Sequence, residues 1–162
     1  MGFPCRWILV AATLAAASPA SAAGLDPLAF FSGRTRGNGE LKVVLKAPVT
    51  ISVDSRGKPD GHGGIVLDQI IREGSKPLRS RRWVLHPTSP TTLSGTLTDA
   101  AGPVRGSVSG RVLKLYYTRK DGLRASHILI LQPGGRTMTN RMTVKRLGLV
   151  VARVEEVIRK LD

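Results

Sequence analysis

Two segments of this sequence carry side chains that suit ligand recognition, because each combines basic and aromatic residues with an alternating pattern. Strand alternation puts three residues of each segment on one face, namely Arg81, Trp83 and Leu85, and Leu113, Leu115 and Tyr117. If these faces point inward, an arginine lies inside the fold beside a tryptophan. An isolated ion in the interior costs several kcal/mol, so Arg81 needs partners. Two roles stay open for it: locking the fold by stacking on the tryptophan, or binding an anionic ligand.

Motifs for covalent catalysis are incomplete. His62-Gly63-Gly64 resembles the start of an esterase oxyanion loop, but that loop needs a nucleophile elbow. The segment 106–110 has the two glycines of an elbow and places Val108 where the serine must stand. A glycine-rich hairpin turn is the alternative interpretation of residues 62–64, and we favour it.

Metal, cofactor and carboxylate sites are also unsupported by spacing. The three histidines are far apart in the sequence with no close-spaced ligand pair, so neither a metal nor a cofactor is expected. Gly37-Asn38-Gly39 lacks the third glycine of a dinucleotide fingerprint. An enzyme would require some of His127, Asp68 and Asp99 to converge in a cleft. We therefore do not expect an enzyme.

The stretch Asp26–Gly39 is predicted to form a short helical plug. Asp26 suits the N-cap, Pro27 the first helical position, and Gly33 the left-handed residue that ends a helix, so we expect a helix over residues 27–32. Phe30 and Phe31 lie in this helix, and at least one should be buried. Gly37 and Gly39 are predicted to mark the bend into the first strand.

Residues 1–22 have the features of a secretion signal. Arg6 gives a positive start, Trp7–Ala17 is an apolar run, and Ala20-Ser21-Ala22 matches a peptidase site. The run is shorter than the roughly 20 residues of a membrane-spanning helix. We expect cleavage near Ala22/Ala23 and one domain over residues 23–162, exported to the periplasm as a soluble protein, which we expect to be a monomer.

Cysteine and charge add to this picture. The single cysteine lies at position 5, inside the predicted signal, so no disulfide and no lipoprotein cysteine remain. The chain has 25 Lys+Arg against 11 Asp+Glu, a formal net charge of +14. Export and the few aromatic residues argue against nucleic acid. The positive charge then serves either an anionic envelope surface or simply the solvated face of a sheet, and both interpretations stay open.

From residue 40 onward the dominant period is two. Leu41, Val43 and Leu45 are predicted to share the apolar face of the first strand, and Val49, Ile51 and Val53 that of the second. Further apolar alternation follows at Ile65, Leu67 and Ile71, and six more strands are predicted at 78–86, 91–99, 104–109, 111–119, 124–132 and 136–145. Short turns separate them, which indicates an all-β antiparallel meander that closes into a lipocalin-like barrel of about eight or nine strands.

The C-terminal segment 149–161 fits two periods. Val150, Val154, Val157 and Leu161 belong to one helical stripe, which predicts an amphipathic helix. Its many valines, directly after a strand, also fit a further strand. We favour the helix and keep the strand as the alternative.

The order and spacing of several residues resemble the bacterial envelope family known as domain of unknown function 3833 (DUF3833). The matching positions are Phe30-Phe31-x-Gly33, Gly37-x-Gly39, Arg81-x-Trp83, Gly95, Asp99, Gly102-x-x-x-Gly106, Tyr116 or Tyr117, and Asn140-Arg141-Met142-x-x-Lys145-x-x-Gly148. The resemblance implies an exported protein with a lipocalin-like barrel and implies no activity; the roles of Asn140, Lys145 and Gly148 stay unknown. The chain departs from the family pattern in lacking the lipoprotein cysteine, in Ser126–Leu129 and in Leu147, and the family's usual C-terminal strand counts against the helix.

The expected function is therefore binding of a small apolar or anionic amphipathic molecule, such as an envelope lipid, inside the barrel. Barrels of about eight strands are either filled by side chains or just large enough for one ligand. A filled interior would favour the alternative, a structural or interaction role for the basic outer surface at anionic lipids or cell-wall polymers.

Overall fold

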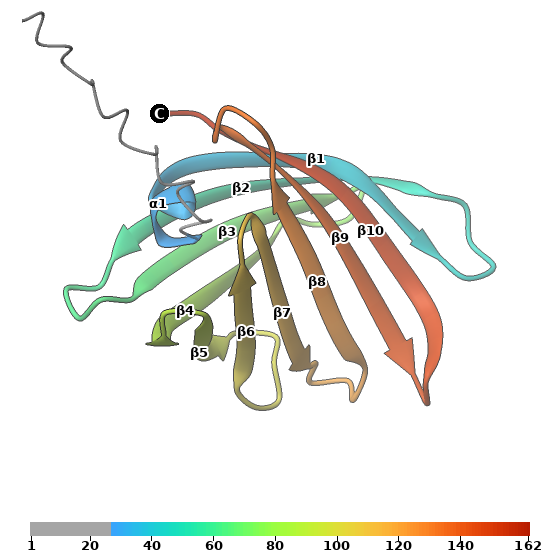
Figure 1. Cartoon of the computed structure of the whole chain (residues 1–162). Helices are drawn as coiled ribbons and strands as arrows, with labels where there is room; N and C mark the ends of the chain where they lie inside the picture. Colours follow the sequence, from blue (N-terminus) through green and yellow to red (C-terminus); the bar gives the residue numbers. More distant parts are fainter. Residues whose placement is uncertain (1–26) are drawn as a thin grey trace, which may run out of the picture.

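The computed structural model describes residues 27–162, and the predicted signal segment lies outside this range. One short helix precedes ten strands. Helix α1 spans Pro27–Phe31, and strands β1 to β10 span Gly33–Val43, Val49–Pro59, Ile65–Glu73, Arg79–Ser89, Thr92–Leu97, Val104–Ser109, Val112–Thr118, Arg124–Leu131, Thr137–Arg146 and Leu149–Lys160. Every strand pairs antiparallel with its neighbours, and β1 pairs with β10, so the sheet closes into a barrel (Figure 1).

Alternation of side chains decides which face is the core. In β7, for example, Leu113, Leu115 and Tyr117 are buried while the residues between them are exposed. The same period of two runs through β3, β8 and β9. Because inward and outward residues alternate along each strand, the inward positions are mostly apolar and most charged side chains face water. The predicted all-β lipocalin-like barrel is confirmed.

The strand count and the C-terminal helix need correction. Residues 149–160 form β10, which pairs with β9 on one side and β1 on the other and so completes the barrel. In the strand register Val154 and Ile158 point inward and Glu156 lies between them. A helix here would leave the edges of β1 and β9 unpaired, and pairing of both edges overrides the helical periodicity. This segment is the tenth strand, which the predicted count of about eight or nine strands did not include.

The start of β1 also differs from the prediction. Gly37 and Gly39 lie within β1 rather than at a bend. A Cβ at Gly39 would lie 2.0 Å from the backbone oxygen of Glu155, so the absence of a side chain lets β1 and β10 approach closely. At the other end β1 stops at Val43, and Leu45, predicted to point inward, is an exposed turn residue.

Helix α1 covers one end of the barrel. Phe30 and Phe31 are both buried, with their rings edge to face at 4.9 Å between centroids. Lys160 of β10 donates hydrogen bonds of 3.1 Å to the carbonyl oxygens of Ala29 and Phe30, where the C-terminal end of a helix attracts a cation. Gly33 follows the helix at a φ of 90°. The predicted helical plug is confirmed, one residue shorter than expected.

The barrel has two different ends. We call the end that α1 covers the closed end, and the opposite end, formed by the β1–β2, β3–β4, β5–β6, β7–β8 and β9–β10 turns, the open end. In Figure 1, α1 lies at the upper left and the β7–β8 and β9–β10 turns lie at the lower edge. Among the described residues, no helix has the length and apolar character to cross a membrane.

Candidate functional site

A layer of polar side chains crosses the barrel interior between its two ends. The layer, which we call the polar layer, comes from seven strands and consists of Ser55, Gln69, Arg81, Tyr117, His127, Asn140 and Glu156. Each of these residues occupies an inward position of its strand, and most are flanked two residues away by apolar or small residues, as Gln69 is by Leu67 and Ile71. The fold therefore brings together residues that are up to about a hundred positions apart in the sequence.

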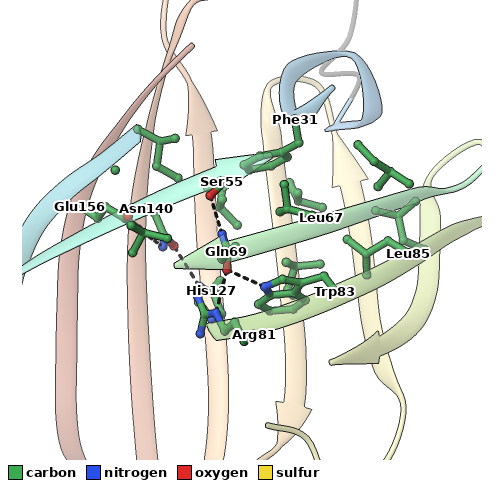
Figure 2. Close-up of a pocket in the computed structure, with 18 residues that line it drawn as sticks. Phe31, Ser55, Leu67, Gln69, Arg81, Trp83, Leu85, His127, Asn140 and Glu156 are labelled. Carbon is green, nitrogen blue, oxygen red and sulfur yellow. Dashed lines mark hydrogen bonds between the residues drawn. The ribbon is translucent and has the colours of Figure 1, made fainter. Parts of the chain in front are cut away.

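Gln69 connects the side chains of one half of the polar layer by hydrogen bonds. Its side-chain nitrogen donates to Ser55 Oγ at 2.9 Å. Its oxygen accepts from Arg81 Nε at 2.7 Å and from Trp83 Nε1 at 2.8 Å (Figure 2). The Arg81 guanidinium also lies 5.3 Å from the centroid of the Trp83 ring. Arg81 is thus held in place by an amide and an aromatic face, and both partners are neutral.

His127 connects the side chains of the other half of the polar layer by hydrogen bonds. Its Nδ1 lies 3.2 Å from Asn140 Oδ1, and the Asn140 amide nitrogen donates to Glu156 Oε2 at 3.0 Å. Since Asn140 Oδ1 can only accept, the neutral imidazole carries its proton on Nδ1. Its Nε2 is then the acceptor that lies 3.4 Å from the Tyr117 hydroxyl. The result is a directed chain of hydrogen bonds from Tyr117 through His127 and Asn140 to Glu156.

Burial shifts the titration of every ionisable group in the polar layer toward its neutral form. Burial, reinforced by the nearby Arg81, lowers the pKa of His127 from 6.5 to about 3. Burial raises the pKa of Glu156, although Asn140 and Arg81 oppose the shift, and it raises the pKa of Tyr117. It also lowers the pKa of Arg81, although the guanidinium stays charged at neutral pH. His127 is therefore neutral at neutral pH, and Arg81 is the fixed positive charge of the interior.

The polar layer separates two spaces of very different size. Toward the closed end, an inner compartment of about 50 Å³ is bordered by Phe31 and the leucines of the core. Toward the open end, an outer cavity of about 660 Å³ has apolar walls, of which Ile51, Ile71, Met142 and Val154 are examples. Arg81, His127, Asn140 and Glu156 border both spaces and form the floor of the outer cavity. The barrel is thus packed at one end and hollow at the other.

The rim of the outer cavity is mostly basic. Lys76, Arg79, Arg119 and Arg146 line it together with the acid Glu73, whereas the other acid that lines the cavity, Glu156, lies at its floor. Arg79 pairs with Asp99 at 2.6 Å. An anionic molecule that approaches this end meets a positive rim before it reaches the apolar walls.

The residues predicted for the interior all lie there. Trp83, Leu85, Leu113, Leu115 and Tyr117 are buried, and Arg81 is partly buried beside them. Only Arg81 of this set borders the outer cavity, whereas the leucines line the inner compartment. Phe30, Phe31 and Gly33 lie at the closed end, in or next to α1.

The three positions of unknown role have separate environments. Asn140 belongs to the polar layer. Lys145 is exposed on β9, and Gly148 lies in the β9–β10 turn with a φ of 85°, a backbone conformation that suits glycine. The structure therefore brings only Asn140 into the candidate site.

Sequence reasoning missed Ser55, Gln69 and Glu156 as site residues. The available signal was a polar residue at an inward position of an alternating strand, as Gln69 is between Leu67 and Ile71. Glu156 gave no such signal, because the helix predicted for residues 149–161 would place its side chain on the solvent-facing side. Gly37 is part of the same arrangement, since a Cβ there would lie 1.7 Å from a Glu156 carboxylate oxygen.

The catalytic motifs considered in the sequence do not assemble. Residues 61–64 form a turn in which Asp60 Oδ1 accepts from the backbone of His62 and Gly64, as the hairpin interpretation predicts. Asp68 pairs with Arg82 on the outer surface and Asp99 lies near the rim, so neither joins His127. Residues 27–162 contain no group of three or more His, Cys, Asp or Glu side chains that could hold a metal.

Solved structures with this fold include two that cover most of this chain. The S-type phycobiliprotein lyase CPES from Guillardia theta matches with a TM-score of 0.65 and 7% identity, covering 83% of this chain and 90% of the lyase. Rv2717c from M. tuberculosis matches with a TM-score of 0.61 and 20% identity, covering 85% of this chain and 99% of Rv2717c. At these identities the likeness shows the fold, a lipocalin-like barrel, and not a shared activity.

The lyase corrects one expectation from the sequence. The absence of complete catalytic motifs led to the prediction that the chain is not an enzyme, and a lyase with the same barrel contradicts it. Motifs of hydrolases and metalloenzymes are a poor guide here, because such a barrel can place reactive side chains from any of its strands.

Sequence comparisons give one family. The model described as protein of unknown function (DUF3833) matches residues 11–160, which is nearly the whole chain. No curated protein matches it in sequence.

Proposed function

The chain belongs to the DUF3833 family, and from its barrel we propose that it binds a small amphipathic anion in the outer cavity. The apolar part of the ligand lies against the walls of the cavity, and its carboxylate or phosphate group pairs with Arg81 at the floor. We also propose that the protein does this after export, on the strength of the signal features of residues 1–22.

The observation that carries the proposal is the state of Arg81. Arg81 borders the outer cavity, and within residues 27–162 no salt bridge involves it. Its hydrogen-bond partner Gln69 and its aromatic partner Trp83 orient the guanidinium without neutralising it. A cation held inside a protein without a counterion attracts an anionic group strongly, because little water competes.

The size and lining of the cavity fit the same class of ligand. A volume of about 660 Å³ lies within the roughly 300–1,000 Å³ range of small-molecule sites. Apolar walls with a few polar groups at the floor are typical of sites that bind one amphipathic molecule. The inner compartment of about 50 Å³ is too small for such a ligand, so the ligand enters from the open end and stops at the polar layer.

Replacing Arg81 by Gln is expected to weaken binding of an anionic amphiphile by about tenfold or more, because a charge pair inside a protein is lost. The probe is dansyl-labelled undecanoic acid, titrated by fluorescence, with its methyl ester as the uncharged comparison. Wild type should prefer the acid to the ester, and Arg81→Gln should bind the two equally.

Arg82→Gln is the matched control. Arg82 is adjacent in the sequence, points outward and pairs with Asp68, so its loss removes the same charge from the outer surface. This variant should bind the acid like wild type. Equal weakening by both variants, or a wild type that does not take up the acid, would overturn the proposal. If the proposal is right, native mass spectrometry of wild-type protein purified from its own envelope should also show a co-purifying anionic amphiphile.

Glu156 gives a second, independent prediction. Its carboxyl borders the same floor, so its deprotonated form repels a ligand anion at Arg81. Because burial raises the pKa of Glu156, binding of the probe should weaken as the pH rises through that raised pKa. At pH values above that raised pKa, Glu156→Gln should bind the dansyl acid several-fold more tightly than wild type does, and it should lose this pH dependence.

The control for Glu156 is its neighbour. Glu155 is exposed on the outer face and pairs with Arg141 at 3.2 Å. Glu155→Gln removes the same charge without changing the cavity and should leave both affinity and pH dependence unchanged. If Glu156→Gln binds no more tightly than Glu155→Gln, the ligand anion does not lie at this floor.

A further inference from the structure

Large apolar side chains are exposed at the tips of three turns of the open end. They are Val44 and Leu45 in the β1–β2 turn, Leu78 in the β3–β4 turn, and Leu147 and Leu149 in and after the β9–β10 turn. Leu45 is 101% exposed and Leu147 is 96% exposed, and with Leu149 they are the most exposed large apolar residues of residues 27–162. We call this set the apolar tips.

The backbone at two of the apolar tips makes leucine an unexpected choice. Leu45 has a φ of 62° and Leu147 a φ of 48°, and in the described part of the chain no other residue except glycines has a positive φ. Glycine or asparagine adopts this conformation at lower cost than leucine. Neither burial nor local conformation therefore accounts for a leucine at these positions, and contact with something outside the barrel does.

The three turns are consecutive around the barrel. The strand order places β9, β10, β1, β2, β3 and β4 side by side, so the β9–β10, β1–β2 and β3–β4 turns are neighbours on the rim. The Val44 amide donates to the Val151 carbonyl oxygen at 3.0 Å and ties the first two turns together. In Figure 1 the β1–β2 turn extends at the right of the barrel and the β9–β10 turn lies below it, both away from α1. The apolar tips thus occupy one side of the rim.

Positive charge surrounds the apolar tips. Lys46 follows Leu45 directly, Lys76 precedes Leu78, and Arg146 precedes Leu147. Lys76 is neutralised by Glu73, whereas Lys46 and Arg146 take part in no salt bridge within residues 27–162. Protruding apolar side chains between lysines and arginines fit the interface of an anionic bilayer, where the apolar groups enter the acyl boundary and the cations meet phosphates.

We propose that the open end docks on an anionic membrane surface, with Leu45 and Leu147 inserted below the headgroups. A bilayer suits this surface better than a folded partner, because the tips stand apart on separate turns and a fluid surface can surround each one. Protein interfaces are also usually depleted in lysine. Docking in this orientation points the mouth of the outer cavity at the lipid. The inference does not depend on ligand binding in that cavity.

The test measures co-sedimentation of the purified protein with lipid vesicles. Wild type should bind vesicles of equal parts phosphatidylcholine and phosphatidylglycerol, and bind pure phosphatidylcholine weakly. The double variant Leu45→Asn with Leu147→Asn should lose affinity for the anionic vesicles by about tenfold or more, because the inserted apolar groups are gone. Asparagine suits positive φ, so this variant should keep or raise the melting temperature.

Two further variants isolate the roles of charge and position. Lys46→Gln with Arg146→Gln should weaken binding to the anionic vesicles and reduce its dependence on salt. Ile128→Thr with Ile130→Thr removes two exposed apolar side chains from the outer wall of β8, away from the rim, and should bind vesicles like wild type. Arg81→Gln should also bind vesicles normally, which separates this inference from the proposed ligand site.

Three outcomes would overturn the inference. The first is a wild type that ignores anionic vesicles at low salt. The second is a Leu45→Asn, Leu147→Asn variant that binds them as well as wild type does. The third is wild type that self-associates in sedimentation velocity through the apolar tips without binding vesicles, since the tips would then contact a second copy of the chain.

Discussion

Replacement of Phe31 by alanine is expected to lower the free energy of unfolding by about 3–5 kcal/mol. Phe31 is 8% exposed, packs edge to face on Phe30 and borders the inner compartment, so its removal leaves a cavity at the closed end. The backbone around it cannot easily collapse into the gap. The carbonyl oxygen of Phe31 lies close to Gly57, and a Cβ added at Gly57 would be 1.9 Å from that oxygen. Urea denaturation followed by circular dichroism measures the change.

Leu45→Ala provides the comparison for this experiment. Leu45 is fully exposed at the opposite end of the barrel, so the same kind of truncation should change the free energy of unfolding by less than about 0.5 kcal/mol. A loss below about 1 kcal/mol for Phe31→Ala would mean that α1 contributes little to stability. Helix α1 would then not hold this end of the barrel shut, and a ligand could reach the polar layer from either side.

The second large effect is loss of stability in mild acid through His127. Its pKa is 6.5 in the unfolded chain and about 3 in the folded barrel, because burial disfavours the imidazolium. Below pH 6.5 the unfolded state takes up a proton that the folded state does not. The contribution of His127 is therefore complete above pH 6.5 and is lost as the pH falls toward 3, at about 1.4 kcal/mol per pH unit.

The measurement compares wild type with His127→Gln, whose amide can still hydrogen-bond to Asn140. Between pH 6.5 and 4 the free energy of unfolding of wild type should fall more steeply, by up to about 1.4 kcal/mol per pH unit. Asp60, Asp68 and Asp121, whose pKa values are lowered by hydrogen bonds, also destabilise the fold in acid. Both proteins share these carboxylates, so their effect cancels in the difference.

Nuclear magnetic resonance gives a direct check of the same residue. The ring signals of His127 in the folded protein should stay at their neutral positions from pH 7 to pH 4. A titration with a midpoint near the ordinary value of 6.5 would show that the imidazole is solvated. The hydrogen-bond chain to Glu156 would then not exist in solution.

Most of the barrel can be predicted from the period of its apolar residues. Alternation in segments such as Ile65–Ile71 and Leu113–Tyr117 indicates a strand with one buried face. Short turns rich in glycine and proline join such strands in antiparallel order. The C-terminal segment is the exception. Its valines fit both a helical stripe and a strand, and pairing with β1 and β9 decides between them.

The candidate site was less accessible to sequence reasoning. The aromatic and apolar members, Trp83 and Tyr117 among them, were found because a predicted strand has only two faces. Gln69 and Glu156 were not found, since a polar residue in a strand looks like a surface residue until its neighbours in space are known. Their partners Arg81 and Asn140 lie 12 and 16 positions away along the chain.

The amino-acid sequence by itself determined an all-β barrel with a short plug at its start, because side-chain alternation and turn chemistry are local properties. Only the tertiary structure decided that the barrel is packed at the closed end and hollow at the open end, with Arg81, which forms no salt bridge within residues 27–162, at the floor of the hollow. That division depends on which side chains from seven strands meet across the interior. Such meetings follow from the register and closure of the sheet, and no single segment of the sequence specifies them.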